Sequence, residues 1–306
     1  MKRILILFSY PRDKEDSLNY GGFAKTLDKS AGKFGYHAQY SALKMLEFKI
    51  VDGKATIYDP INQRDLRNYD LVFFRMWAKE FEAATACAFY LRKYNVPFID
   101  QEAFGTRVFT KLAGYFNMWH ANLPIPDTFY GPHSAILAEA KAGKDFKFPL
   151  ILKTIEGKKG QDNYLVKNLG QLRKILGKNR DLAFLMQKYI PNDGDYRFLV
   201  TGNKIGLIIK RVAAAGSHLN NTSAGARAEL VKAKQFKPQV MEDALKAAKI
   251  RQRQLAGVDV ILDKNSGRHY ILEVNKVPQI ITGAYVEQKI EAFNRFIKDQ
   301  LAGRKR

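Results

Sequence analysis

Short apolar runs separated by helical stretches make up the first hundred residues. The runs at 3–8, 70–75 and 96–100 have the length and composition of buried parallel strands. Between them, residues 17–35 are polar and helix-like, and residues 79–94 carry apolar side chains at helical spacing. This alternation predicts an α/β domain in which helices cover a small parallel sheet.

After residue 105 the pattern changes to helices mixed with antiparallel strands. The predicted helices cover residues 106–121, 169–178, 239–256 and 285–301, and the predicted strands lie within 148–153, 183–190, 196–211 and 258–275. The last two ranges are hairpins, which turn near Gly202 and Gly267. We therefore expect three units: an α/β domain over residues 1–105 and two α+β subdomains over residues 106–190 and 191–306.

The composition favours a cytoplasmic globular protein. The chain has 306 residues, 46% of them hydrophobic, but no run of about 18 apolar residues that would span a membrane. The N-terminal apolar stretch, residues 4–8, is too short for a signal peptide, and no cleavage site follows it. A single cysteine, Cys87, excludes an internal disulfide framework and a cysteine metal cluster, and we expect it to pack within a helix.

The chain is strongly basic. Lys and Arg number 51 against 30 Asp and Glu, which gives a net charge of +21. Such a field attracts acidic partners, such as nucleic acid, an acidic peptide or a polyanionic metabolite. The basic residues are spread along the whole chain without an arginine-rich arm, however, so solubility or a basic bias of the host proteome explains the charge equally well.

The segment 257–275 has the features of a metal site. Glu273 and Asn275 are two residues apart in one predicted strand, so their side chains share a face. Asp259 shares this face only if the residue numbers of each pair across the hairpin add up to an even number. We expect this parity because the predicted hairpin loop, residues 265–267, has an odd number of residues. Three oxygen ligands suit Mg²⁺. The alternative is a hairpin with solvated acids, but the apolar neighbours of Glu273 argue against it.

A glycine-containing loop follows the predicted strand 148–153. Gly157 and Gly160 let backbone amides approach phosphate groups, and Lys158 adds positive charge. By itself this spacing also describes an ordinary turn. Its place directly after Lys153 favours phosphate binding, whereas the absence of a G-x-x-x-x-G-K-[ST] sequence excludes a Walker-type site.

Other candidate residues carry a weaker signal alone. Lys111 lies on a predicted helix and would by itself be an ordinary surface lysine. The strand end at residues 187–190 offers backbone groups suited to reading an adenine ring. Arg197, Lys210 and Arg211 alternate with apolar residues on one hairpin and could face the same cleft, where arginine clamps phosphate or carboxylate groups.

In their order along the chain, these segments resemble the ATP-grasp superfamily, most closely the RimK-type ligases that add glutamate to protein or peptide ends. The matching elements are Lys111, Lys153, GKKG (157–160), QKYI (187–190), DYR (195–197), KR (210–211), NNTSAG (220–225), AGVDV (256–260) and EVN (273–275). The first third of the chain is compatible with the pre-ATP-grasp domain of that family. The resemblance therefore implies an ATP-grasp fold behind an N-terminal parallel-sheet domain.

The resemblance also implies a role for each matching residue. Lys111 and Lys153 would contact the phosphates of ATP, with the loop of Gly157, Lys158 and Gly160 closing over them; Gln187, Lys188, Tyr189 and Ile190 would hold the adenine; Asp195 and Lys210 would lie at the nucleotide; Arg197, Arg211 and Asn221 would act at the transferring phosphate and acyl group; and Asp259, Glu273 and Asn275 would hold Mg²⁺ or Mn²⁺. The family also favours a homo-oligomer.

Four positions depart from the family pattern. The third loop glycine is replaced by Asp162, an arginine by Leu219, a serine by Val277 and a glycine by Gln279. The metal and ATP positions are kept while the substrate positions differ. This combination predicts the same activation chemistry on a different carboxylate or amine.

Together these features predict a Mg-ATP-dependent ligase that converts a carboxylate into an acyl-phosphate and joins it to an amine, with an acidic peptide as one candidate substrate. One alternative is a non-catalytic, regulatory Mg-ATP-binding protein, against which the intact Asp259, Glu273 and Asn275 argue. The other is a nucleic-acid-binding protein, for which the sequence has neither a zinc motif nor an RNP sequence. We expect neither nucleic acid nor a membrane as a partner.

Overall fold

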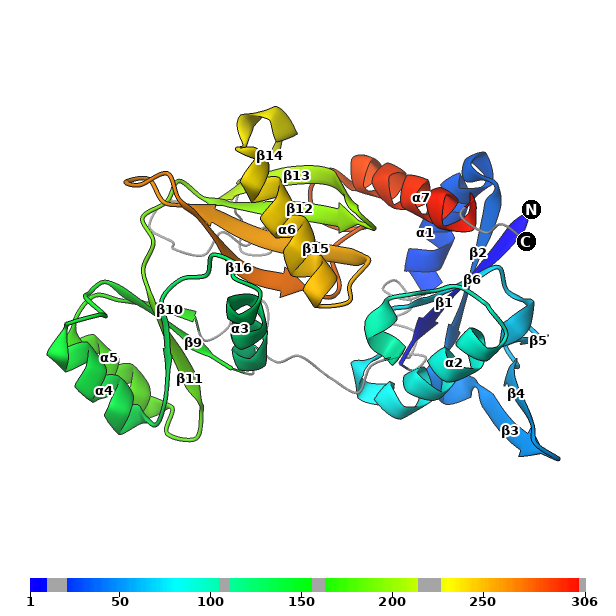
Figure 1. The fold of residues 1–306 in the computed structure, drawn as a ribbon, viewed down its shortest axis with the longest axis horizontal. Coiled ribbons are helices and arrows are strands. Elements are labelled where there is room, and N and C mark those ends of the chain that lie inside the picture. Colours follow the sequence, from blue (N-terminus) through cyan, green and yellow to red (C-terminus); the bar gives the residue numbers. More distant parts are fainter. Residues whose placement is uncertain (10–20, 105–110, 156–162, 214–226, 303–306) are drawn as a thin grey trace.

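The computed structural model describes residues 1–9, 21–104, 111–155, 163–213 and 227–302. Figure 1 shows a central antiparallel sheet between a parallel sheet, which carries the N-terminus, and a smaller sheet flanked by two helices. The predicted class, a parallel sheet followed by antiparallel α+β parts, is confirmed. In the described ranges no helix combines the length and apolar character that crossing a bilayer requires.

The N-terminal sheet is parallel throughout, as predicted. Its strands are β1 (Lys2–Phe8), β2 (Tyr36–Ala42), β6 (Leu71–Phe74) and β7 (Phe98–Ile99), in the order β2-β1-β6-β7, and the helices on its two faces are α1 (Gly21–Ala31), α2 (Phe81–Lys93) and α7 (Val286–Ala302). Ile4 and Ile6 pack with α1 and α7, whereas Leu5 and Leu7 pack with α2. Burial on both faces explains why β1 is continuously apolar.

The sequence pattern missed a second, antiparallel sheet in this part. It consists of β3 (Glu47–Val51), β4 (Lys54–Asp59) and β5 (Arg64–Asp65). Every residue of β3 is exposed, so no apolar alternation marks it. Single-turn 3₁₀ helices, at Gly32–Phe34, Leu43–Met45, Leu66–Asn68, Ala78–Glu80, Gln101–Phe104 and Ala233–Gln235, connect several elements. Cys87 is buried in α2, as expected.

The small sheet is built around two helices on one face. Its strands are β8 (Thr128–Tyr130), β9 (Leu150–Thr154), β10 (Asn163–Val166) and β11 (Phe184–Lys188), in the order β10-β9-β11-β8, and the helices of this region are α3 (Lys111–His120), α4 (His133–Ala142) and α5 (Leu169–Lys178). Leu150 and Leu152 pack with α4 and α5. Lys153 therefore projects from the opposite face, because neighbouring side chains of a strand alternate.

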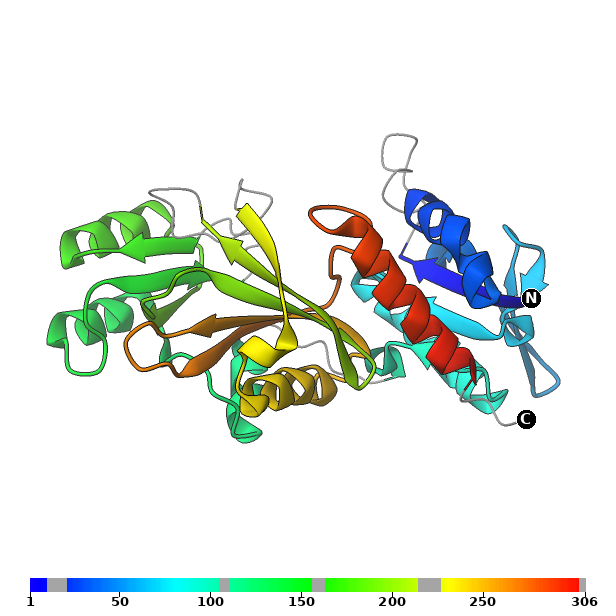
Figure 2. The same cartoon turned by 90° about the horizontal axis from the view of Figure 1, so that it is seen from above.

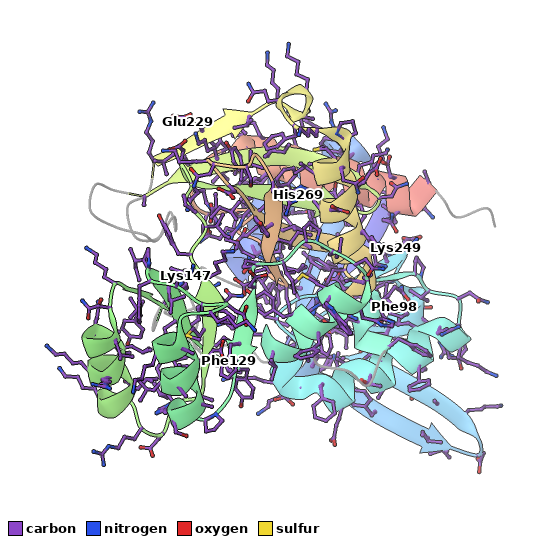
Figure 3. All side chains as sticks on the ribbon, turned by 60° about the vertical axis from the view of Figure 1, so that its left-hand side comes forward. Phe98, Phe129, Lys147, Glu229, Lys249 and His269 are labelled. Carbon is purple, nitrogen blue, oxygen red and sulfur yellow. The ribbon has the colours of Figure 1, made fainter. Side chains whose placement is uncertain are left out.

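The central sheet has one covered face and one charged face. Its strands are β12 (Asp195–Thr201), β13 (Lys204–Val212), β14 (Arg227–Val231), β15 (Leu255–Leu262) and β16 (His269–Asn275), in the order β14-β13-β12-β15-β16, and α6 (Pro238–Ile250) covers one face. Phe198, Val258 and Val260 pack beneath α6. His269, labelled in Figure 3, places Nε2 2.8 Å from a carboxylate oxygen of Asp243 in α6.

One sequence expectation about the C-terminal part needs correction. The predicted helix 239–256 ends at Ile250, and Leu255 already belongs to β15. The Ala-rich sequence continues the helical pattern, but the Asp100 carboxylate accepts hydrogen bonds from the backbone N–H groups of Gln254 and Leu255 and holds the chain extended. Helix α7 packs on the N-terminal sheet and also contacts β12 and β13, and Figure 2 shows it between the N-terminal and central sheets.

Candidate active site

The hairpin of β15 and β16 brings three predicted metal ligands to one face of the central sheet. Asp259 lies directly opposite Glu273, and Gly257 lies opposite Asn275. These pairs put the side chains of Asp259, Glu273 and Asn275 on the face that α6 leaves uncovered. The predicted shared face is therefore confirmed.

The reason for the shared face differs from the one expected. The hairpin loop, residues 263–268, has an even length, and the pairs near the turn, such as Val260 with Ile271, would leave Asp259 on the wrong face. A β-bulge at Leu272 adds one residue to β16 and restores the parity. Tyr115 of α3 donates a 2.7 Å hydrogen bond to the Leu272 carbonyl and so fixes the bulge.

Two arginines and two aspartates form a buried network beside these residues. Arg197 donates from Nε and Nη2 to the two carboxylate oxygens of Asp259, both at 2.8 Å. Arg211 makes the same paired contact with Asp195, both at 2.6 Å, and its Nη2 also lies 3.1 Å from Asp259. Asn275 Nδ2 donates to Asp259 at 3.0 Å. Such forked contacts fix both orientation and position.

The network sets the protonation of its carboxylates. Burial opposes the ionisation of Asp259, but the positive charges of Arg197 and Arg211 outweigh it and hold the pKa of this carboxyl below its usual range. Burial raises the pKa of Asp195, Arg211 opposes this increase, and the charge of Asp259 adds to it. At neutral pH, Asp259 is therefore an anion that is held rigidly by cations.

The predicted phosphate-binding lysines lie close to Glu273. Desolvation by the surrounding protein and the charge of Asp259 raise the pKa of Glu273, and the positive charges of Lys153 and Lys111 act against this increase. Lys111 extends from α3 to donate a 2.8 Å hydrogen bond to the Thr154 carbonyl at the end of β9. The structure thus brings both lysines, which are far apart in sequence, to the carboxylate edge of the central sheet.

The strand end predicted to bind adenine lies at the end of β11. Gln187 is buried and donates from Nε2 to the Thr128 hydroxyl at 2.7 Å. Lys188 is exposed, and its ammonium nitrogen lies 3.5 Å from a carboxylate oxygen of Asp127. Tyr189 and Ile190 follow the strand as it leaves the small sheet toward β12. This segment connects the small sheet to the central sheet.

Lys210 does not join the other candidates. It pairs with Tyr196 across β12 and β13, on the face covered by α6, and its ammonium lies 5.8 Å from the centre of the Tyr196 ring. Consecutive strand residues point to opposite faces, so Lys210 and Arg211 cannot both face one cleft. Gly157, Lys158, Gly160 and Asn221, which were also predicted at the site, lie outside the described residues.

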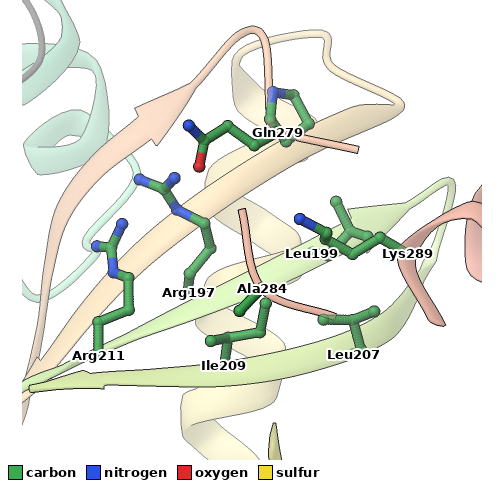
Figure 4. A pocket seen from close by; sticks show the side chains of 9 residues that line it. Arg197, Leu199, Leu207, Ile209, Arg211, Gln279, Ala284 and Lys289 are labelled. Carbon is green, nitrogen blue, oxygen red and sulfur yellow. The ribbon is translucent and has the colours of Figure 1, made fainter. Parts of the chain in front are cut away.

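Two buried cations near the site escaped the sequence interpretation. Arg251, just after α6, is buried; burial lowers its pKa to about 10, and Glu273 opposes the decrease. Lys289 of α7 is also buried, in a pocket beside Arg197 (Figure 4). A signal for Lys289 exists in the sequence: it precedes the buried Phe293 by four residues and Ile297 by eight, so it occupies the apolar face of its helix.

The donor set fits a hard divalent cation. The described residues contain no group of three His, Cys, Asp or Glu side chains that could hold a metal, so a third oxygen would come from Asn275. In that same part of the chain no direct hydrogen-bond donor to the Glu273 carboxylate is found. A bound cation would stabilise the ionised form of Glu273, whose pKa is raised beside Asp259. Oxygen ligands are those that Mg²⁺ prefers.

Comparison with known protein families gives one match over more than half of the chain. The RimK-like ATP-grasp domain matches residues 134–299. A curated relative, the "Probable alpha-L-glutamate ligase" of Syntrophotalea carbinolica, is 26% identical over 83% of this chain and 91% of its own length. Further relatives with this name are 32–34% identical, but the aligned part is only 28–44% of their length.

Solved structures share the fold at low sequence identity. The ATP-grasp ligase PsnB, complexed with minimal precursor, Mg and ADP, has a TM-score of 0.66 at 14% identity and covers 98% of this chain and 97% of its own. The RiPP-associated ATP-grasp ligase of Chryseobacterium gregarium, in complex with ADP and a leader and core peptide, has a TM-score of 0.68 at 13% identity, with 98% and 97% coverage. At such low identity, the TM-scores show similarity of fold alone.

Proposed function

The chain belongs to the RimK-like ATP-grasp family and is an ATP-dependent ligase that forms C–N bonds, and from this premise we propose that it activates a carboxylate as an acyl-phosphate and joins it to an amine. The observation that carries the proposal is the opposition of Asp259 and Glu273 on the open face of the central sheet, next to Lys111 and Lys153. This arrangement combines cation ligands with phosphate-binding cations in one place.

We place the nucleotide between the small and central sheets. The adenine would lie at residues 187–190, with the phosphates toward Lys153 and Lys111. Glu273, Asn275 and Asp259 would hold Mg²⁺, which when bound would offset the negative charge of the phosphates. Asp259 would exchange part of its contact with Arg197 and Arg211 for the cation, because its oxygens are now engaged by both arginines.

Arg197 and Arg211 are the groups best placed to handle the reacting carboxylate. Both guanidinium groups project from the same face of β12 and β13, beside Asp259. Arginine binds carboxylate and phosphate in a forked geometry, and the buried setting strengthens its charge interactions. These side chains would orient the carboxylate toward the γ-phosphate and stabilise charge during transfer. The protein itself need supply no covalent nucleophile.

The names of the relatives suggest a substrate class. Curated relatives are named alpha-L-glutamate ligases, and structural neighbours hold a precursor peptide or a leader and core peptide. We therefore propose an amino acid or a peptide as the substrate of this chain. A non-catalytic ATP-binding role remains the second candidate, and it predicts ATP binding without turnover.

An ADP-release screen tests the proposal. The protein with Mg-ATP is given single amino acids and short peptides, and ADP is measured for each pair. We expect ADP release that requires both Mg²⁺ and one particular acid–amine pair. ATP binding with no substrate-dependent ADP would contradict the proposal and favour the regulatory alternative.

A matched pair of variants separates chemistry from folding. Glu273→Gln should abolish substrate-dependent ADP release, while circular dichroism and thermal unfolding remain close to the parent. Glu287→Gln makes the same change at an exposed position of α7 and should leave activity intact. Full activity of Glu273→Gln would rule out the proposed role of this carboxylate.

A further inference from the structure

Strand β3 forms an open edge in the N-terminal part of the chain. It is the outer strand of the β3-β4-β5 sheet, and each of its five residues is exposed. Among the residues that the structure describes, no strand pairs with its free side. Figure 1 shows the β3-β4 hairpin projecting from the N-terminal domain, at the end of the molecule away from the small sheet. Such an edge offers N–H and C=O groups to another strand, and natural proteins usually cover it or blunt it.

The edge carries two large apolar side chains that the rest of the chain leaves uncovered. Ile50 is 80% exposed, and Phe48 is 45% exposed. Both lie on the face of the sheet from which Leu46, just before β3, and Ile57 of β4 pack into the core of the N-terminal part. The apolar face of this sheet therefore extends past the core that covers it, which an edge strand in contact with water usually avoids.

The turn of the hairpin decides which main-chain groups of β3 point outward. Val51 pairs with Lys54 across a two-residue turn, and both turn residues, 52–53, have positive φ. In such a turn Val51 is hydrogen-bonded to Lys54, and every second residue back along β3 bonds to β4 in the same way. The N–H and C=O groups of Phe48 and Ile50 therefore point away from β4, toward the free side of the strand.

The charges of β3 are complementary to those of a second copy in one register. Two identical strands in one antiparallel sheet are related by a two-fold axis perpendicular to it, so opposite residues have numbers of equal parity. With this axis at Phe48, Glu47 of each copy lies opposite Lys49 of the other, which makes two pairs of opposite charge. An axis at Glu47 or at Lys49 would place like charges opposite each other, and an axis at Ile50 would place uncharged residues opposite both.

The same register covers the exposed apolar side chains. Phe48 lies opposite Phe48 of the second copy, and Ile50 lies opposite Leu46, at the border of the other copy's core. The two Phe48 residues exchange both of their outward main-chain hydrogen bonds. The N–H of Ile50 reaches the C=O of Leu46, whose own N–H already donates to the Leu43 carbonyl. Charge, apolar contact and main-chain direction therefore agree on one axis.

We propose that two copies of this chain pair through β3, antiparallel and with the two-fold axis at Phe48, so that their three-stranded sheets join into one. The inference goes beyond the proposed ligase chemistry and does not depend on it, because the hairpin lies away from β15 and β16 (Figure 1). Two paired strands of this length bury less area than a standard protein interface, so we expect a dissociation constant of about 1–100 µM.

Charge exchange across the axis tests the proposal. Sedimentation velocity of the full chain, from about 1 to 300 µM, should show a monomer–dimer equilibrium in the parent. Glu47→Lys and Lys49→Glu should each weaken association by about tenfold, whereas the double variant should return to within about threefold of the parent. Lys54→Glu makes the same change on the exposed surface of β4 and should associate like the parent. A monomeric parent, a dimer that the single changes leave intact, a double variant that is not restored, or equal weakening by Lys54→Glu would overturn the proposal.

A cysteine placed at the axis tests the register directly. The single native cysteine, Cys87, is buried in α2, so Phe48→Cys adds one accessible thiol. In the proposed register this thiol faces its counterpart within reach of a short bis-maleimide linker, whereas the thiols of Asp52→Cys would lie about 26 Å apart along the strands. We expect a covalent dimer from Phe48→Cys and little from Asp52→Cys. Cross-linking of Phe48→Cys that does not exceed that of Asp52→Cys would overturn the proposed register.

Discussion

The hydroxyl of Tyr115 donates a 2.7 Å hydrogen bond to the carbonyl of Leu272, the residue that forms the bulge in β16. Through this contact, helix α3 holds the register that places Glu273 opposite Asp259. Tyr115→Phe should lower the stability by about 1 kcal/mol, the usual net value of one hydrogen bond. It should also reduce the rate of ADP release, because the bulge that loosens lies beside the proposed metal ligands.

The matched control for this change is Tyr90→Phe. Tyr90 also donates its hydroxyl to a partner, the Asp65 carboxylate, but in the N-terminal part. Its loss should affect urea unfolding without affecting the KM or kcat of ADP release. A Tyr115→Phe enzyme with unchanged kinetics would show that the bulge does not depend on this bond.

Lys153 should contribute strongly to ATP binding. It is carried on the rigid strand β9, and its positive charge is close enough to affect Glu273. Lys153→Met should weaken the binding of an ATP analogue by about 10- to 100-fold, the range for a charge-assisted hydrogen bond. Lys178→Met, at the exposed end of α5, is the control and should bind normally. Equal affinities of the two variants would exclude Lys153 from the phosphate site.

Arg211 should be essential for stability as well as for the site. Its side chain is 3% exposed and holds both Asp195 and Asp259. Arg211→Met would remove the cation that pairs with two buried carboxylates. We therefore expect the free energy of unfolding, measured with urea, to fall by about 3–5 kcal/mol. Arg227→Met removes an exposed pair with Glu229 and should cost at most about 1 kcal/mol. A stability loss no larger than that of Arg227→Met would contradict the network.

The buried Lys289 of α7 predicts a pH dependence of stability. Burial lowers its pKa to about 8, below the ordinary lysine value, so the folded protein binds this proton more weakly than the unfolded chain does. This group should therefore make the free energy of unfolding rise with pH between its folded pKa near 8 and the higher unfolded value.

Urea unfolding, measured from pH 7 to 9.5, checks this dependence. The increase in the free energy of unfolding above pH 8 should be present in the parent and in Lys298→Met, at an exposed position of α7, but smaller in Lys289→Met. An equal increase in Lys289→Met would assign the titration to another group.

Strongly patterned elements were predictable from the sequence, and weakly patterned ones were not. The apolar run of β1 and the buried position of Cys87 followed from local composition. The exposed strand β3 has no alternation to detect. The end of α6 depends on the distant Asp100 carboxylate, which captures backbone N–H groups beyond the helix, and no local signal reports such a contact.

The candidate site shows the same division. Residues on one strand, such as Glu273 and Asn275, share a face by simple parity, and this part of the site was predictable. The position of Asp259 depends on a bulge, which the sequence does not mark. The predicted face was therefore correct, but the predicted cause, a loop of odd length, was wrong. Lys210 was placed with Arg211, although strand parity alone separates them. The pairing of Arg197 with Asp259 needs strand order as well as pattern.

Trapping the activated carboxylate with hydroxylamine tests the central claim most directly. The full chain, Mg-ATP and a panel of amino acids and peptides are incubated with hydroxylamine, and ADP and hydroxamate are measured together. If the ligase works through an acyl-phosphate, at least one acid gives hydroxamate in proportion to ADP, and both products disappear in Glu273→Gln. ATP binding without hydroxamate from any member of the panel, or ADP release that no carboxylate stimulates, would contradict the account.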